Sequence, residues 1–267
     1  MKHLVDVEWL AKRLDRNDLV VVDASVMGSA NQEAGIPGAV RFDIDGVLSR
    51  GVHDMLPPRQ FERELRALGL KAGDRVVAYD ADGIFSSARA WWMLRAAGIR
   101  AAVLDGGLPA WQAAGHEVAP VAENLGREGD VDISWESTRF RNARFVERRL
   151  SAGDPVLDAR SAERFTGEVE DPREGVRAGH IPGAKSLPFT ELEVDGHMLP
   201  ASELRKRIAE HVDSAEQPLT ASCGSGVTAC VIALAATLAG HKHVSVYDGS
   251  WADWGAENSG RPVAVGE

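Results

Sequence analysis

Short apolar runs alternate with longer amphipathic stretches along this chain, and the whole alternation occurs twice. Residues 20–25 (VVVDAS) and 155–160 (PVLDAR) are apolar runs that close on an aspartate. Residues 74–98 and 217–240 each begin as a β-type run, turn at glycine and continue with a helical pattern. Strands that alternate with helices in this way are typical of mainly parallel sheets with crossover helices. The pattern therefore predicts an α/β fold.

The two halves of the chain repeat each other block by block. GIPGAVRFDID returns as HIPGAKSLPFT, DMLPPRQFERELRALG as HMLPASELRKRIAEH, and VLDGGLPAWQAAG as VYDGSWADWGAEN. The offset between matched positions ranges from 135 residues (Asp23 to Asp158) to 145 residues (Gly38 to Gly183). An offset held this nearly constant indicates a duplicated structural unit.

We therefore expect two α/β domains of similar architecture, each a mainly parallel sheet flanked by helices. The first is predicted over residues 1–122 and the second over residues 141–267, and glycine and acidic residues mark the linker over residues 123–140. One position separates the halves chemically, because Cys223 stands where the first half has Asp80, 143 residues earlier. Only the second domain is predicted to carry a nucleophile, at the carboxyl end of a strand.

Composition narrows the class of protein. The chain has 267 residues, of which 44% are hydrophobic and 26% charged, as in ordinary globular domains. A formal net charge of -10 disfavours nucleic-acid binding, which draws on lysine and arginine surfaces. No run of 18 apolar residues is present, so no membrane span is expected. The first fifteen residues have an amphipathic helix pattern without the features of a signal peptide, which predicts a cytoplasmic location.

Two cysteines, Cys223 and Cys230, make up the whole cysteine content. At helical spacing they would lie about 10 Å apart, too far for a disulfide. A zinc site would need about four clustered ligands, so no metal is expected. No organic cofactor is expected either. Cys230 lies inside an apolar helical pattern and is interpreted as a small buried side chain.

The chemistry is expected in the loop that starts at Cys223. Gly224 and Gly226 allow main-chain N–H groups to curl around one point, and a helix predicted to begin near Val227 adds its N-terminal dipole. Such a cradle stabilises a thiolate, which is the reactive form of cysteine. Ser225 supplies a hydroxyl that can orient a substrate or pass a proton. A cysteine beside glycines can also be simply a small buried residue.

Two other classes of protein compete with an enzyme that uses a nucleophilic sulfur. A cysteine phosphatase needs an arginine six positions after its cysteine, and this chain has Ala229 there. A non-catalytic binding module would not need the cysteine, which this chain retains. Both classes are therefore disfavoured.

The motifs CGSGVTAC and GHIPGA, the DGSWADW block and the tandem repeat resemble the rhodanese superfamily, and within it the tandem-domain 3-mercaptopyruvate sulfurtransferases. The resemblance spans about Val5 to Pro262 and implies two tandem rhodanese-like domains. It further implies that Cys223 takes sulfur from 3-mercaptopyruvate as a persulfide and releases pyruvate. A thioredoxin-like protein, a small thiol or cyanide would then accept the sulfur. Thiosulfate-using members carry arginine and lysine where this loop has Gly224 and Ser225, so thiosulfate sulfurtransferase is the alternative.

The resemblance also implies residues that hold the substrate. Arg164 and Arg173, nine residues apart, match the arginines that bind the keto-acid carboxylate, although the usual GTEPEPR reads GEVEDPR here. The loop residues implied to bind the substrate are Gly224, Gly226, Val227 and Thr228.

Some members of the superfamily add an Asp–His–Ser relay to the cysteine. Here Asp45 and Ser225 match the aspartate and the serine. The histidine is displaced by one position, because the chain reads GVHDMLP, with Asp54 where members have histidine and His53 one residue earlier. His53 is the expected member of the relay.

Overall fold

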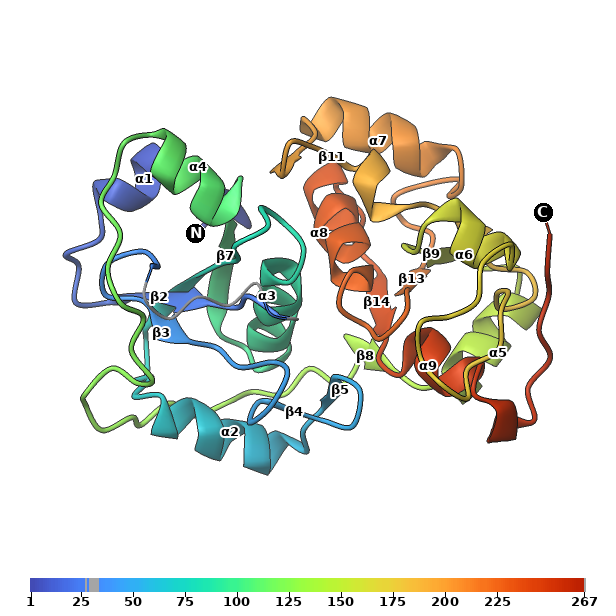
Figure 1. Ribbon diagram of the computed structural model, residues 1–267, viewed down its shortest axis with the longest axis horizontal. Coiled ribbons are helices and arrows are strands. Elements are labelled where there is room, and N and C mark those ends of the chain that lie inside the picture. Colours follow the sequence, from blue (N-terminus) through green and yellow to red (C-terminus); the bar gives the residue numbers. More distant parts are fainter. Residues whose placement is uncertain (27, 29–33, 267) are drawn as a thin grey trace. The chain divides into compact units, whose positions relative to one another are not determined.

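The computed structural model describes residues 1–26, 28 and 34–266 and divides them into two compact units (Figure 1). The first unit comprises Met1–Gly51, Met55–Glu136 and Asp195–Met198. The second comprises Val52–Asp54, Ser137–Val194 and Leu199–Glu267. Val52–Asp54 belongs to the second unit, although its neighbours in sequence belong to the first. Asp195–Met198 belongs to the first unit, although its neighbours in sequence belong to the second. Each unit is an α/β structure with its own sheet, as the alternating pattern predicts.

The elements follow one another in an order that repeats. Those of the first half are β1 (Leu4–Val5), α1 (Val7–Ala11), β2 (Leu19–Asp23), β3 (Val40–Arg41), β4 (Ser49–Arg50), β5 (Asp54–Met55), α2 (Pro58–Ala67), β6 (Arg75–Tyr79), α3 (Ser87–Ala96), β7 (Arg100–Leu104) and α4 (Gly107–Ala113). Those of the second half are β8 (Phe140–Arg141), α5 (Ala143–Ser151), β9 (Val156–Asp158), α6 (Ala162–Thr166), β10 (Lys185–Ser186), η1 (Phe189–Glu191), β11 (Glu193–Val194), β12 (His197–Met198), α7 (Ala201–Ala209), β13 (Leu219–Ser222), α8 (Ala229–Ala239), β14 (Val244–Tyr247), α9 (Ser250–Trp254) and η2 (Glu257–Ser259).

The two main sheets have the same topology. The first has the strand order β1-β7-β6-β2-β3, and the second has the order β8-β14-β13-β9-β10 when read in the same direction. Neighbouring strands of both sheets run parallel. The carboxyl ends of the strands in each sheet therefore lie at one edge of that sheet, where the loop after β6 begins in the first unit and the loop after β13 begins in the second.

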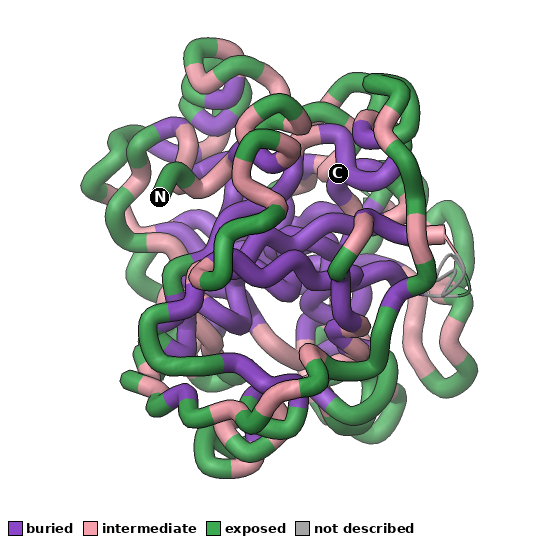
Figure 2. The backbone as a smooth tube through the Cα atoms, turned by 90° about the vertical axis from the view of Figure 1, so that its left-hand side faces the viewer, coloured by how far each residue is buried: buried purple, intermediate pink, exposed green. Residues whose placement is uncertain are grey.

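Hydrophobic side chains explain why these segments form strands and helices. All five residues of β2 are buried, as expected for a strand covered on both faces. Helix α8 is apolar around its whole circumference and almost entirely buried, which places it inside the second unit. Trp251 and Trp254 of α9 are buried in the core cluster of that unit. Figure 2 shows the buried stretches running through the interior, with exposed loops around them.

The N-terminal segment differs from the single helix predicted over the first fifteen residues. Leu4 and Val5 form strand β1 and pair in parallel with Val103 and Leu104 of β7. The helix starts only after Asp6, whose carboxylate accepts a hydrogen bond from the amide of Trp9 at 2.7 Å. An open sheet edge thus takes up residues whose periodicity alone favours a helix. Within the described part of the chain, no helix is long and apolar enough to cross a membrane.

The loop after β6 shows what replaces a cysteine in the first unit. Asp80 is fully buried, and its carboxylate accepts hydrogen bonds from four main-chain amides. The donors are Asp82, Phe85, Ser86 and Ser87, at distances from 2.7 to 3.0 Å. The loop surrounds the carboxylate with main-chain amides, an arrangement that the sequence predicts only for the loop at Cys223.

Replacing Asp80 by alanine should destabilise the first unit, because four buried amides lose their acceptor. Each unsatisfied buried group costs about 1–3 kcal/mol, so we expect a loss of roughly 3 kcal/mol or more in the free energy of unfolding. Chemical unfolding followed by the fluorescence of Trp91 and Trp92 in α3 measures this loss. Asp82→Ala is the matched control, because Asp82 is exposed in the same loop. Equal stability of the two variants would contradict the structural role of the carboxylate.

Candidate active site

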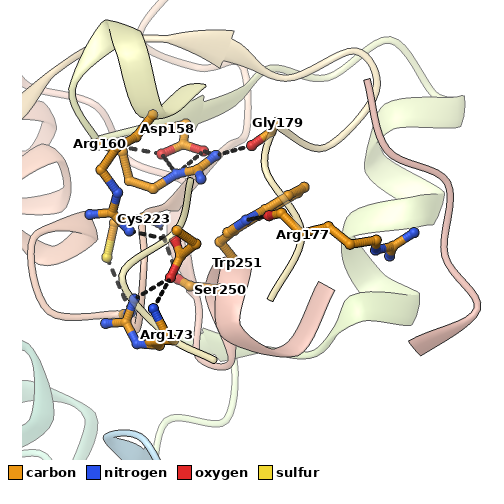
Figure 3. Close-up of polar contacts among 11 residues, drawn as sticks. Asp158, Arg160, Arg173, Arg177, Gly179, Cys223, Ser250 and Trp251 are labelled. Atoms are coloured by element: carbon orange, nitrogen blue, oxygen red, sulfur yellow. Dashed lines mark hydrogen bonds and ion pairs between the residues drawn. The ribbon is translucent and has the colours of Figure 1, made fainter. Parts of the chain in front are cut away.

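Cys223 lies in the turn between strand β13 and helix α8, and its side chain is buried. Two main-chain contacts fix the start of the turn. The amide of Cys223 donates to Ser250 Oγ at 3.1 Å, and its carbonyl accepts from the amide of Trp251 at 2.9 Å (Figure 3). Ser250 has a positive φ of 48°, so the DGSW block holds the cysteine loop at the cost of local strain. The repeat pointed to this block, but sequence reasoning did not assign Ser250 a role in the site.

The sulfur of Cys223 accepts a hydrogen bond from the amide of Gly226 at 3.1 Å. Gly226 has a φ of 80°, a conformation that costs other residues about 1–2 kcal/mol. One amide of the turn, that of Gly226, therefore points towards the sulfur, and a ring of several amides around it stays a prediction. Helix α8 begins at Ala229 rather than near Val227, because the residues before it still belong to the turn. Val227 and Thr228 are both buried and lead from the turn into the helix.

Gly224 has a different role from the one predicted. It was expected to supply an unusual backbone angle, but its φ is not positive. A Cβ at this position would instead lie 3.1 Å from Arg173 Nη1 and 3.2 Å from Arg164 Nη2. The glycine therefore leaves space for two guanidinium groups beside the cysteine loop. Sequence periodicity and turn preferences cannot reveal this, since the arginines come from another segment.

Arg164 and Arg173 are brought together as the sequence predicts. Arg164 is on α6, and Arg173 follows in the loop that leads to the GHIPGA motif. Both side chains are 27% exposed and both pair with the carboxylate of Asp171, Arg164 Nη2 at 2.7 Å and Arg173 Nη1 at 3.3 Å. Arg164 Nε has no hydrogen-bond partner among the described residues.

Ser225 and His53 also meet, although 172 residues separate them in the chain. The Nδ1 atom of His53 lies 3.0 Å from Ser225 Oγ, within hydrogen-bond distance. His53 has a φ of 68°, a strained backbone of the kind that concentrates at functional sites. Asp45 belongs to the first unit and lies on an exposed turn between β3 and β4. Its membership of a relay stays a prediction.

Other charged side chains near the loop are committed to structure. Arg160 pairs with Asp158 through Nη2 at 2.7 Å, donates to the carbonyl of Gly179, and lies over the ring of Trp251 (Figure 3). Arg177 extends away from Cys223 in the same view and bonds to backbone carbonyls. Arg164 and Arg173, in contrast, approach the loop at Gly224.

The second cysteine of the chain, Cys230, lies in the helix that follows the turn. Both cysteines are free thiols. Cys230 is buried in α8, where its thiol donates to the carbonyl of Gly226 at 3.3 Å and so braces the turn. No group of three or more side chains suited to holding a metal ion occurs among the residues that the structure describes.

These observations define a two-module α/β protein in which one module has a cysteine loop faced by two arginines and the other has an anion-filled loop. The family model for the rhodanese-like domain matches residues 6–114 and 142–257. The chain therefore belongs to the rhodanese-like family, with two copies of the domain.

Similar proteins cover nearly the full length of the chain. The 3-mercaptopyruvate sulfurtransferase of Escherichia coli K12 is 36% identical over 94% of this chain and 94% of its own. A mitochondrial thiosulfate/3-mercaptopyruvate sulfurtransferase of Arabidopsis thaliana is 37% identical over 95% of this chain and 76% of its own. The crystal structure of SseA from Escherichia coli, a 3-mercaptopyruvate sulfotransferase, superposes on this chain with a TM-score of 0.81 at 33% sequence identity. The match covers 94% of this chain and 99% of that one.

The two glycines of the loop should respond differently to replacement by alanine. Gly226→Ala forces a side chain into a positive-φ backbone, and we expect a loss of about 1–2 kcal/mol in the free energy of unfolding of the second unit. Gly224→Ala leaves the backbone unstrained and meets only the ends of two flexible side chains, so we expect less than half that loss. Chemical denaturation of both variants provides the measurement. Equal destabilisation by the two substitutions would contradict the interpretation that Gly226 is required for its backbone conformation and Gly224 for the space beside it.

Proposed function

We propose that this chain transfers sulfur from 3-mercaptopyruvate to a thiol-containing or other thiophilic acceptor through a persulfide on Cys223. One observation carries the proposal: the sulfur of Cys223 is held by the Gly226 amide at 3.1 Å while two arginines approach the adjacent Gly224. A nucleophilic sulfur and a carboxylate-binding pair thus lie on the same loop. Relatives at 36–37% identity that span most of the chain carry the same activity in their names.

The first half-reaction uses both features. Arg164 and Arg173, whose side chains are partly exposed, bind the carboxylate of the keto acid. The Cys223 thiolate attacks the sulfur of the substrate, the carbon–sulfur bond breaks, and its electron pair passes to the pyruvate enolate. The enolate then takes up the proton that the substrate thiol gives up. Cys223 retains the outer sulfur as a persulfide anion, so the step is covalent catalysis.

The second half-reaction regenerates the thiolate. An acceptor thiolate or cyanide attacks the outer sulfur, the sulfur–sulfur bond breaks, and its electron pair returns to Cys223. The main-chain amide of Gly226 that holds the sulfur before the reaction is still present to stabilise the thiolate that leaves. A thioredoxin-like protein or a small thiol suits this role. The cytoplasmic location expected from the sequence stays a prediction.

Ser225 and His53 serve the proton transfer of the first half-reaction. Ser225 lies in the loop that holds the sulfur, and its Oγ atom is 3.0 Å from Nδ1 of the His53 imidazole. A hydroxyl that shares a hydrogen bond with an imidazole can pass a proton to the enolate and be reprotonated from the ring. Asp45 is the proposed third member on the basis of the family pattern alone.

Thiosulfate is the competing donor, and a binding module without catalysis is the competing class. Thiosulfate is a dianion, and no loop residue from Cys223 to Thr228 is charged. A keto acid carries a single charge, which suits a loop that contributes amides alone. A module that only binds would gain nothing from a glycine-specific backbone turn that places an amide on the sulfur.

Incubation with 3-mercaptopyruvate should add one sulfur atom to Cys223 and release one pyruvate per chain before any acceptor is present. Intact-protein mass spectrometry and a pyruvate assay measure the two products. Cys223→Ser should show neither, and Cys230→Ser should behave as the unchanged protein because its thiol is a structural brace. With thiosulfate we expect slower loading. Turnover of 3-mercaptopyruvate by Cys223→Ser at the original rate would remove Cys223 from the mechanism.

Arg164→Ala should raise the KM for 3-mercaptopyruvate roughly tenfold or more, because a charge-assisted hydrogen bond to the carboxylate is lost. Thermal stability should change little, since Arg173 still pairs with Asp171. Steady-state kinetics and a melting curve provide the two measurements. Arg144→Ala, an exposed arginine on α5, is the control for the change in charge. An unchanged KM would return Arg164 to an ordinary surface role.

A further inference from the structure

Asp171 is the buried partner of both substrate-facing arginines. Its side chain is 1% exposed, while each arginine is 27% exposed. One carboxylate oxygen accepts from Arg164 Nη2 at 2.7 Å. The other accepts from Arg173 Nη1 at 3.3 Å and from the amide of Arg173 at 3.1 Å. A single carboxylate therefore bridges the two guanidinium groups and fixes the backbone beside them.

This bridge sets the charge that a donor meets. The two arginines and Asp171 are joined by direct contacts, and the loop from Cys223 to Thr228 contributes no charged side chain. Two positive charges less one negative charge leave a formal net charge of one positive at this cluster. A singly charged ligand balances that charge, whereas a doubly charged ligand leaves one negative charge uncompensated in a partly buried place.

We propose that Asp171 determines donor specificity by cancelling one of the two positive charges that Arg164 and Arg173 bring to the cysteine loop. The inference rests on the proposed function, in which these arginines hold the donor anion. Asp171 acts through the arginines and does not touch the donor, so it is a positioning residue. It holds both guanidinium groups in place and limits the site to monoanions such as α-keto acids.

A purely structural role for Asp171 makes a different prediction. If the carboxylate only held the arginines in position, its removal would weaken the binding of every anion to a similar degree. If it sets the charge of the site, its removal favours dianions over monoanions. The ratio between the two donors therefore distinguishes the roles, because a general loss of activity cancels in the ratio.

Asp171→Asn is the main test, since it removes the charge and keeps the shape. We expect the ratio of kcat/KM for thiosulfate to kcat/KM for 3-mercaptopyruvate to rise about fivefold or more, as one added charge–charge contact at ~4 Å gives even in a water-like medium. Asp171→Glu keeps the charge and should leave the ratio within about twofold of the original. Glu170→Gln makes the same change of charge at an exposed neighbour and should also leave it unchanged.

The opposite change of charge gives a second, independent variant. Arg164→Ala lowers the formal charge of the cluster from one positive to zero, so the same ratio should fall rather than rise. This variant keeps the inference testable if Asp171→Asn does not fold. Ratios that stay constant in both variants, or a proportional loss of both donors in Asp171→Asn, would overturn the inference.

Binding without turnover separates this inference from the proposed function. Calorimetric titration with sulfate and with pyruvate measures a dianion and a monoanion on the unmodified thiol. Asp171→Asn should raise the affinity for sulfate relative to that for pyruvate by about fivefold or more. If the unchanged protein did not turn over 3-mercaptopyruvate, the proposed function would fail while this titration would still decide the role of Asp171. If turnover is normal and the sulfate-to-pyruvate ratio does not move, the specificity role alone fails.

Discussion

The hydrogen bond from the Gly226 amide to the sulfur of Cys223 is the contact on which the site depends. It exists because Gly226 adopts a φ of 80° and so turns its N–H back towards the residue three positions earlier. The buried surroundings make such a bond stronger than it would be in water. Helix α8 starts after the turn. The DGSW block fixes the first residue of the turn, because Ser250 Oγ accepts a hydrogen bond from the amide of Cys223. The rest of the second unit holds this short piece of backbone in place.

The duplicated fold contains a natural comparison for that contact. The loop after β6 in the first unit surrounds the carboxylate of Asp80 with four amides, whereas the loop after β13 in the second presents the thiol of Cys223. The same topology thus supports a loop that encloses a fixed carboxylate and a loop that presents a thiol. The carboxylate of Asp80 has a structural role in the first unit, whereas the thiol of Cys223 is the nucleophile of the proposed mechanism in the second.

The sequence pattern itself predicted the α/β architecture and the tandem repeat. The resemblance to the rhodanese superfamily implied that His53 and Ser225 come together, and their side chains lie 3.0 Å apart. The prediction was wrong at two positions of the segment that follows β13. Gly224 was assigned a backbone role, but the reason for a glycine there is the space taken by two arginines of another loop. The start of α8 was predicted two residues too early. Helix propensity cannot distinguish a turn that points an amide at a sulfur from the first turn of a helix.

Two separate segments of the chain supply the main-chain amide and the cations of the site. If the loop itself carried the positive charge, as the thiosulfate-using pattern does, the same side chains would attract the donor and surround the sulfur. Here the loop supplies main-chain amides and the Ser225 hydroxyl but no charged side chain, and the cations come from α6 and the segment that follows it. The charge of the donor site can then be changed at Asp171, outside the loop, without altering the backbone that holds the sulfur. This separation lets donor choice vary while the geometry of sulfur transfer stays fixed.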